Sequence, residues 1–283
     1  VVRLATTLAS YGHRVDAIYR GDEELWSDGV TWWPHDRHPR KCEVLISCEW
    51  LLHLKEFEYN RLIVPLNKIN PMLNGLEDKV NAFVCLSNEH VRELRVYTPI
   101  VREDQCVVIA PGVEIPPLQL PKVKHRLIWC NTPERGLVHL ARQWPRILER
   151  VPDATIQITY GLERSVETNK WLMDNMAQEL LEVRDWAKAY PESVLNTGRM
   201  NKEGLQRAQL EAEVYAYPCD APLPGIFHAL AGMEAAAAGC AMLLSDLEGL
   251  PEVFGECADF IPIPVQEEEW ANAIADLLLD EER

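Results

Sequence analysis

The sequence lacks the residue patterns by which many proteins bind metals, form disulfide frameworks or cross membranes. Its eight cysteines occur singly, without a C-x-x-C pair. No His/Cys cluster has the spacing of a zinc site, and no Asp-x-Asp pair occurs. No apolar run is long enough to span a membrane, and no signal peptide is visible. We therefore expect a protein with no metal, no transmembrane segment and buried, reduced thiols, located in the cytoplasm.

Basic residues are scarce as well. The chain has 28 Lys and Arg residues against 44 Asp and Glu residues, which gives a formal net charge of −16 at pH 7. A nucleic-acid-binding protein would show a basic surface, and binding to anionic lipid also needs positive charge. We therefore exclude nucleic acid as a partner. The acidic surplus is interpreted as a solvated surface that aids solubility.

The length and the prolines of the chain predict two domains. A chain of 283 residues with 47% hydrophobic content can form two cores of ordinary size. Four prolines between residues 111 and 121 predict an extended linker, so the domains are expected at 1–122 and 123–283. Strand-like apolar runs alternate with helical patterns, which predicts α/β domains with doubly wound parallel sheets. The chain starts inside a helical pattern without Met, so we expect a segment before it.

The stretch 214–252 predicts a strand, a loop, an Ala-rich helix and a second strand. The strands are expected at 214–217 and 241–244, and Gly239 ends a helix over 227–238. Such a unit implies parallel strands. The loop that enters the helix offers free backbone N–H groups and the positive end of a helix dipole, which suit a phosphate. Close helix–sheet packing alone would also explain the Ala and Gly residues.

Glu234 stands out in this unit because it is an acid among Leu230, Ala236 and Ala237 on a largely apolar helix. A buried carboxylate without a partner is costly. We favour a ligand hydroxyl as its partner over a capping or purely structural role.

The run from Pro218 and Gly225 through Glu234-Ala-Ala-Ala-Ala-Gly239 to Gly249-Leu-Pro-Glu-Val253 resembles the donor-site signature of retaining glycosyltransferases with the GT-B fold, of the family 4 type. The family has two donor-binding glutamates. Glu234 matches the second, which implies contact with the ribose hydroxyls of a nucleotide sugar, and Ile226 occupies the place of the first. The resemblance implies two Rossmann-like domains facing a cleft, with the acceptor domain at 1–122 lacking its first strand and the donor domain at 123–283.

The segment Asn131-Thr-Pro-Glu-Arg-Gly resembles the family's P-E-K-G step. Arg135 then stands in the place of the lysine that holds the donor diphosphate, and a guanidinium suits phosphate because its fork can bond two oxygens. A helix-start arginine that pairs with Glu134 or solvent is the alternative. Asn131 and Thr132 occupy the positions where the family usually has a second cation.

The resemblance implies further site residues on both sides of the cleft. His228, at the start of the Ala-rich helix, is expected to contact phosphate or acceptor, with capping or packing as an equal alternative. Acceptor-side contacts are expected from Asn67, Lys68 and Asn70, although a turn role explains Asn67 better. The other expected donor-binding residues are Gly161, Arg199, Met200, Gly225, Ile226, Phe227, Ala229 and Leu230.

The resemblance implies transfer of a sugar from a nucleotide diphosphate sugar, as co-substrate, to a glycan, lipid or small-molecule acceptor with retention of anomeric configuration. It implies no cofactor and no metal. A second hypothesis is a GT-B-shaped nucleotide- or glycan-binding or scaffold protein with weak or no catalysis. Ile226 and the lack of a histidine between His53 and His90 favour it. A third hypothesis is a sugar-nucleotide epimerase.

Overall fold

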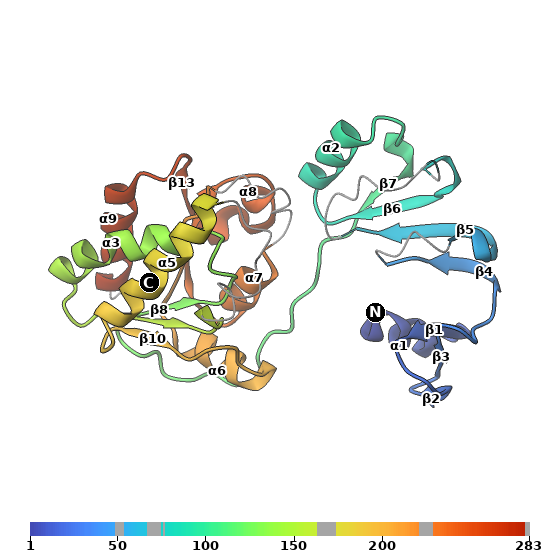
Figure 1. Cartoon of the computed structure of the whole chain (residues 1–283), viewed down its shortest axis with the longest axis horizontal. Helices are drawn as coiled ribbons and strands as arrows, with labels where there is room; N and C mark the ends of the chain where they lie inside the picture. The colour runs from blue at the N-terminus through green and yellow to red at the C-terminus, as the bar shows by residue number, and fades with distance from the viewer. Residues whose placement is uncertain (49–53, 67–74, 76, 163–173, 221–228, 281–283) are drawn as a thin grey trace. The chain divides into compact units, whose positions relative to one another are not determined.

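The computed structural model describes residues 1–48, 54–66, 75, 77–162, 174–220 and 229–280 (Figure 1). The chain forms two compact units. The first comprises Val1–Cys85 and Val91–Val108, and the second comprises Leu86–His90 and Ile109–Arg283. The domain boundary predicted at residue 122 lies in an extended segment of the second unit and stays a prediction.

The first unit begins with a small sheet of three strands. Helix α1 (Val2–Ser10) continues the helical pattern at the start of the sequence and ends before Gly12, and β1 (Val15–Tyr19) follows. Strand β3 (Val30–Pro34) pairs in parallel with β1 and antiparallel with β2 (Leu25–Ser27). The β2–β3 hairpin was not predicted. Its turn contains Asp28 and Gly29 at φ of 54° and 79°, the positive values that an Asp-Gly hairpin turn requires.

A separate parallel sheet of four strands forms the rest of the first unit. Its strands follow chain order: β4 (Lys41–Ile46), β5 (Glu58–Pro65), β6 (Ala82–Cys85) and β7 (Cys106–Val108). The connections include the 3₁₀ helices η1 (Leu54–Glu56), η2 (Glu77–Lys79) and η3 (Glu103–Gln105) and the helix α2 (Asn88–Tyr97). The hydroxyl of Ser87 accepts a hydrogen bond of 3.1 Å from the N–H of His90 and so caps the start of α2. The sequence did not predict that the first half contains two sheets.

The second unit is built on a parallel sheet of six strands in the order β10-β9-β8-β11-β12-β13. The order reverses between β8 and β11, which is the pattern of a doubly wound sheet. The predicted strands at 214–217 and 241–244 are neighbours in it, as expected. The strands are β8 (Arg126–Trp129), β9 (Thr155–Ile158), β10 (Val194–Asn196), β11 (Val214–Tyr217), β12 (Ala241–Asp246) and β13 (Asp259–Pro262).

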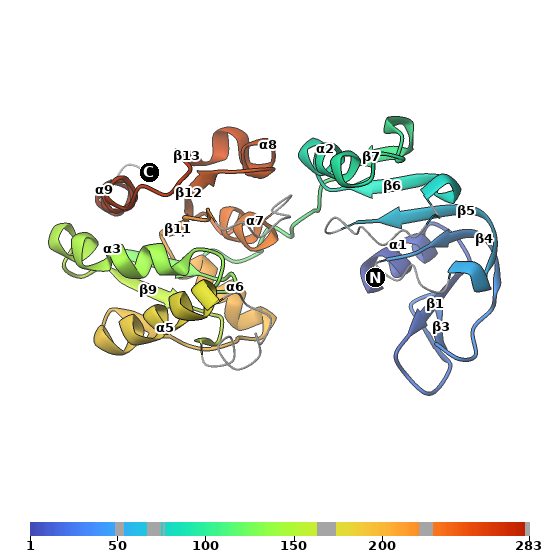
Figure 2. The same ribbon diagram turned by 45° about the horizontal axis from the view of Figure 1, so that its top comes forward.

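Helices cover both faces of this sheet. Figure 2 shows α3 (Leu137–Arg150) between α9 (Glu267–Leu279) and α5 (Asp174–Ala189). On the opposite face, α6 (Lys202–Glu211) packs on β8, and α7 (Leu230–Ala237) packs on β11 and β12. The two helices also contact each other. A short helix, α8 (Leu250–Phe254), and the 3₁₀ helix η4 (Gly255–Cys257) follow β12. Neither α6 nor β13 was predicted.

Large aromatic side chains form much of the core of the second unit. Trp129, Trp144 and Trp270 are at most 1% exposed. The indole N–H of Trp144 donates to the hydroxyl of Ser193 at 2.9 Å, and its ring lies edge-on to Trp186. Replacing such a residue with Ala typically costs about 3–5 kcal/mol. Trp144 is therefore a residue of the core.

The end of α7 follows the sequence expectation, whereas the expectation of buried thiols holds for Cys85, Cys219 and Cys240 and is wrong for the exposed Cys257. Gly239 ends α7 at a φ of 79°. The amine of Lys122 donates to the carbonyl of Ala238 at 2.9 Å, which satisfies one of the last carbonyls of the helix. All eight cysteines are free thiols. Within the described residues, no helix combines the length and the apolar character that crossing a membrane requires.

Candidate functional site

The described donor residues gather at the carboxyl edge of the six-stranded sheet. Its strands are all parallel, so their carboxyl ends share one edge. Ligands of doubly wound sheets bind at this edge, where the strand order reverses. At the reversal, β8 leads into the β8–α3 loop (residues 130–136) and β11 leads into the β11 exit (residues 218–220).

Gly136 holds these two segments against each other. Its φ is 102°, in the left-handed region that favours glycine. A Cβ at this position would lie 2.9 Å from the carbonyl carbon of Pro218, closer still to its oxygen, and 3.2 Å from the Cα of Cys219. These are backbone atoms, which cannot turn away as the end of a side chain can. Only glycine therefore allows the β8–α3 loop to lie directly on the β11 exit.

Asn131, at the start of the β8–α3 loop, is fixed by a buried tyrosine. Its side-chain N–H donates to the hydroxyl oxygen of Tyr215 at 2.5 Å. Tyr215 is fully buried, and this burial raises the pKa of its phenol well above the ordinary value. The phenol is therefore neutral, and the orientation of the Asn131 amide is set by a hydrogen bond rather than by charge.

Arg135, near the end of the same loop, contacts a second buried tyrosine. Its guanidinium lies close enough to the hydroxyl of Tyr217, which is 2% exposed, to act on the pKa of that phenol. Burial raises the pKa of the Tyr217 phenol, and the charge of Arg135 opposes part of this rise. Within the described residues Arg135 forms no ion pair, and its neighbour Glu134 has a buried carboxylate oxygen without a hydrogen-bond partner. The alternative of an Arg135–Glu134 pair is therefore not what the structure shows.

Glu234 lies on α7 beside the end of β8. Its carboxylate is half-buried. It is close enough to the thiol of Cys130 to contribute to the raised pKa of that thiol, which reaches about 12 mainly because of burial. The Cys130 thiol also lies 3.9 Å from the carbonyl oxygen of Ala231, one turn earlier on α7. Glu234 is therefore next to the residue that precedes Asn131.

The β11 exit is anchored on its other side by an ion pair. Nε2 of His139, in the first turn of α3, lies 2.9 Å from Oδ1 of Asp220. Its hydrogen bond to His139 holds the pKa of the Asp220 carboxyl below the ordinary value, and a backbone hydrogen bond from Val265 acts in the same direction. Gly136, which precedes α3, and His139, in the first turn of α3, thus both hold the β11 exit in place.

The predicted donor-binding residues Gly161, Arg199 and Met200 follow β9 and β10. A Cβ on Gly161 would lie 4.0 Å from the backbone nitrogen of Arg199, so these two predicted positions are neighbours. The Arg199 side chain is exposed. The Met200 side chain packs back over Gly204 in α6, 3.7 Å from Sδ to the place of a Cβ there. The structure therefore brings Gly161 and Arg199 together and turns the side chain of Met200 toward the fold.

The remaining predicted residues are only partly described. Thr132 is half-buried, and its carbonyl accepts from the N–H of Arg135 at 3.1 Å. Ala229 precedes α7 and packs against the core, and the side chain of Leu230 is 43% exposed. Outside the described residues lie the predicted donor residues Gly225, Ile226 and Phe227, the predicted catalytic His228, and the acceptor-side Asn67, Lys68 and Asn70.

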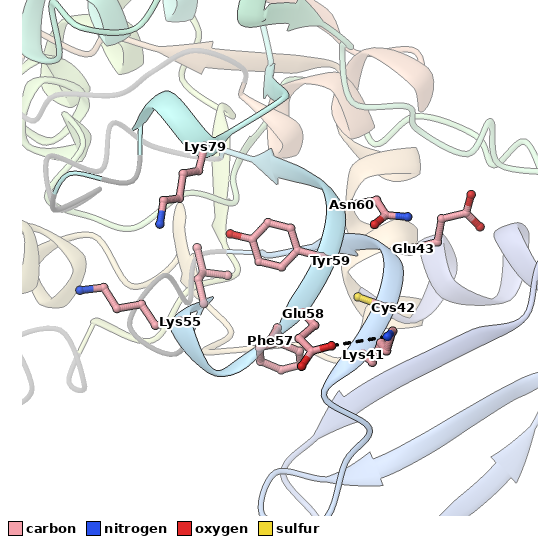
Figure 3. A pocket seen from close by; sticks show the side chains of 10 residues that line it. Lys41, Cys42, Glu43, Lys55, Phe57, Glu58, Tyr59, Asn60 and Lys79 are labelled. Atoms are coloured by element: carbon pink, nitrogen blue, oxygen red, sulfur yellow. Dashed lines mark ion pairs between the residues drawn. The ribbon is translucent and has the colours of Figure 1, made fainter.

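Within the described residues, no group of three or more His, Cys, Asp or Glu side chains could hold a metal ion. The first unit has an open pocket of about 820 Å³ at the amino ends of β4 and β5 (Figure 3). Its amines and carboxylates largely offset one another, and Lys41 pairs with Glu58 at 3.5 Å. The pocket lies at the edge opposite to the one where parallel sheets bind ligands, so we assign it no part in the donor site. Its lining residues are Lys41, Cys42, Glu43, Leu54, Lys55, Phe57, Glu58, Tyr59, Asn60 and Lys79.

Sequence reasoning missed Tyr215, Tyr217, His139 and Asp220 as supports of this site. The tyrosines carried a usable signal, because residues two apart on a strand face the same side of the sheet. Their strand was correctly predicted and was expected to end at a ligand loop. The pair of His139 and Asp220 carried no such signal, since the two residues lie far apart in the sequence.

Comparison with known proteins gives one family and many structures. The family model described as glycosyl transferases group 1 matches residues 126–280. These residues include β8, the β8–α3 loop, β11, α7 and the other elements that carry the described donor residues. Comparison with curated protein sequences gives no match.

Solved structures with the same fold include several glycosyltransferases. Sucrose-phosphate synthase from Thermosynechococcus elongatus has a TM-score of 0.71 at 14% identity, over 98% of this chain and 83% of that one. A glycosyltransferase from Rickettsia africae ESF-5 has a TM-score of 0.68 at 12% identity, over 98% and 83%. Anabaena HepE, solved with UDP and glucose, has a TM-score of 0.59 at 14% identity, over 78% and 62%. At these identities the likeness shows the fold, which is GT-B.

Proposed function

The chain belongs to the glycosyl transferase group 1 family, and from this premise we propose that it transfers a sugar from a nucleotide diphosphate sugar to an acceptor with retention of anomeric configuration. The observation that carries the proposal is the environment of Arg135. It lies at the reversal of the sheet, close to the buried side chain of Tyr217, and has no ion-pair partner among the described residues.

The proposed chemistry is stabilisation of a leaving group. Negative charge develops on the departing nucleoside diphosphate, and a cation that is already oriented lowers the energy of that state without reorganisation. Arg135 supplies the cation, and the fork of its guanidinium matches two phosphate oxygens. Asn131, fixed by Tyr215, offers amide hydrogen-bonding capacity at the other end of the same loop.

We propose that Glu234 accepts hydrogen bonds from the ribose hydroxyls. Support comes from its half-buried place beside Cys130 and from the absence of a described side chain that donates to it. Gly161 and Arg199 lie together after β9 and β10, and we assign them to the nucleobase. The roles of residues 225–228 in the phosphate loop and of Asn67, Lys68 and Asn70 toward the acceptor stay predictions.

We propose that Arg135 and loop N–H groups compensate the diphosphate charge, rather than a divalent cation. The acceptor is a glycan, a lipid or a small molecule. The eight free thiols support a reducing compartment, and we place the protein in the cytoplasm.

The test is release of nucleoside diphosphate from UDP-, GDP- and ADP-sugars, with and without EDTA. Arg135→Ala should lower the rate of release on the order of a hundredfold to a thousandfold. Arg207→Ala is the matched control, because Arg207 is an exposed arginine that pairs with Glu211 on α6, and it should leave the rate unchanged. The anomeric configuration of the product, read by NMR, tests retention. Loss of release in EDTA would contradict metal independence.

A second candidate is a nucleotide- or glycan-binding protein of this fold that does not turn the sugar over. It is favoured by Ile226, which stands where the family has its first donor glutamate. This candidate predicts tight binding of a nucleoside diphosphate with no release from any sugar donor. An epimerase would instead convert the donor in the absence of any acceptor.

A further inference from the structure

The open pocket of the first unit, with a volume of about 820 Å³, forms where two neighbouring strands start at different levels. Strand β5 begins at Glu58, but its pairing with β6 begins only at Ile63, which lies opposite Ala82. The first residues of β5 therefore extend beyond the amino end of β6. The 3₁₀ helices η1 and η2, which precede these two strands, contribute residues to the walls of the space that remains (Figure 3). Pockets that bind small molecules typically have volumes of about 300–1,000 Å³.

Each of the two 3₁₀ helices presents a lysine to this pocket from a fixed backbone. In η1, Lys55 follows Leu54, which is 3% exposed in the core of the first unit. In η2, Lys79 precedes Val80, which is 2% exposed in the same core. The buried amide of Gln105 donates to the carbonyl of Val80 at 2.7 Å and to that of the first residue of η2 at 3.1 Å. The positions of both lysines are thus set by the core beneath them.

The charges of these two lysines are not compensated. Within the part of the chain that the structure describes, the amines of Lys55 and Lys79 form no ion pair and no hydrogen bond. Lys41, the third lysine of the pocket, instead lies 3.5 Å from Glu58. Figure 3 shows the amines of Lys55 and Lys79 pointing to the same side of the pocket, away from that pair. In a chain of net charge −16, this side is a local positive region that suits an anion.

The other side of the pocket carries hydrogen-bond acceptors. The carboxylates of Glu43 and Glu58 and the amide of Asn60 lie there (Figure 3). A carboxylate can only accept, so the part of a ligand that lies against it must carry donors such as hydroxyl groups. The ring of Tyr59 lies between the two sides, and Phe57 adds a second aromatic ring to the lining. Aromatic rings of this kind offer an apolar surface on which the C–H face of a sugar can pack.

We propose that this pocket binds an acidic saccharide, a sugar that carries a phosphate or a carboxylate group. Lys55 and Lys79 bind the acidic group, Tyr59 packs against the sugar ring, and the carboxylates on the other side accept from its hydroxyls. The site is separate from the donor site, because it lies in the first unit and at the amino ends of its strands. It therefore does not rest on the proposed transfer reaction.

The experiment measures binding of defined probes to the full chain by ligand-observed NMR, without any nucleotide. The acidic probes are glucose 6-phosphate and trigalacturonate, and their neutral counterparts are glucose and maltotriose. At least one acidic probe should bind on the order of tenfold more tightly than its counterpart, and the pair that differs more tells whether phosphate or carboxylate is preferred. Inorganic phosphate, which lacks the sugar, should bind more weakly than glucose 6-phosphate. Binding of neither acidic probe would overturn the proposal.

Lysine variants test whether the binding is local. Lys55→Ala and Lys79→Ala should each weaken binding of the acidic probe about threefold, and the double variant on the order of tenfold, because the contribution of each exposed ion pair is small. Both side chains are exposed, so the fold should not change. Lys188→Ala, which removes an exposed lysine from α5 in the second unit, is the matched control for net charge and should bind as wild type.

Two further results would overturn the proposal. An equal loss in Lys188→Ala would show a general effect of charge rather than a site. Inorganic phosphate that binds as tightly as glucose 6-phosphate, with the same sensitivity to Lys55→Ala, would show a site for a simple ion. The assay contains no sugar donor, so a failure of the proposed transfer would leave these results unaffected.

Discussion

Gly136 and Pro218 are in such close contact that a methyl group on Gly136 would lie 2.9 Å from the Pro218 carbonyl carbon. The contact joins the loop after β8 to the segment after β11, and these two strands flank the reversal of the sheet. It explains why a glycine follows Arg135: the position needs a positive φ and has no room for a side chain.

Gly136→Ala should therefore destabilise the protein by about 3 kcal/mol, from backbone strain and from displacement of the Pro218 backbone. Urea unfolding followed by circular dichroism measures this loss. Gly112→Ala is the matched control, because that residue has neither a left-handed φ nor an atom within 4 Å of an added Cβ. A loss in Gly136→Ala no larger than in the control would contradict the contact.

The ion pair of His139 with Asp220 predicts a dependence of stability on acid pH. The folded-state pKa of Asp220 lies below its ordinary value of 3.8, chiefly because of the hydrogen bond to His139. The pair therefore stabilises the fold above the unfolded pKa, and this stabilisation is lost as pH falls through the lowered folded pKa. Asp220→Asn should be less stable than wild type at pH 7, and the two should converge once the pH has fallen below the lowered folded-state pKa of Asp220.

Asp153→Asn provides the comparison. Asp153 pairs with His125 at 2.7 Å near the amino ends of β8 and β9, at the edge of the sheet opposite to the loops of the site. It should leave nucleoside diphosphate binding unchanged, whereas Asp220→Asn should weaken it. If Asp153→Asn and Asp220→Asn changed nucleoside diphosphate binding equally, the proposal that the β11 exit supports the donor site would be contradicted.

Glu234 is predicted to recognise the sugar of a nucleoside. Glu234→Gln should lower affinity for UDP on the order of tenfold, since a hydrogen bond to a charged acceptor is weakened, and should reduce the preference for UDP over 2′-deoxy-UDP. Calorimetry with both nucleotides measures this preference, with ADP and GDP pairs in parallel. Glu203→Gln, an exposed acid on α6, is the control. If Glu234→Gln still preferred UDP over 2′-deoxy-UDP as strongly as wild type does, another residue would bind the ribose hydroxyls.

The thiols should differ in reactivity by position. Burial raises the pKa of Cys130 and Cys85 to about 12 and that of Cys240 to about 11, so almost none of the nucleophilic thiolate exists at pH 8. Cys257 is exposed. Iodoacetamide labelling mapped by mass spectrometry should modify Cys257 long before the other three. Early labelling of Cys130 in the folded protein would contradict the packing of α7 on the end of β8.

Much of the second unit could be predicted from sequence because its strands are short, apolar and followed by clear stop signals. The strands predicted at 214–217 and 241–244 match β11 and most of β12, and Gly239 ends α7 as expected. Strand β13 was missed because Asp259–Pro262 alternates weakly and ends in proline. Helix α6 was missed because its long polar face hides a narrow apolar stripe.

The first unit was predicted less well because local turn chemistry decides its topology. The Asp28-Gly29 turn makes β3 antiparallel to β2 and places it in parallel beside β1. No apolar periodicity in that segment predicts this pairing. The site, too, was predicted only where residue type and local sequence were sufficient. Arg135 and Glu234 could be selected from residue type and neighbours, but the hydroxyls beneath Asn131 and Arg135 depend on which strands pair, and β8 and β11 are far apart in the sequence.

The ring of Tyr215 sets the distance between two elements of the site. Its Cε1 lies 3.3 Å from the place of a Cβ on Gly232, so the ring touches the helix that carries Glu234, and its hydroxyl touches Asn131. An aromatic ring cannot be compressed, so it acts as a rigid spacer between α7 and the start of the β8–α3 loop. A smaller side chain at position 215 would remove this spacer and let the two elements approach each other.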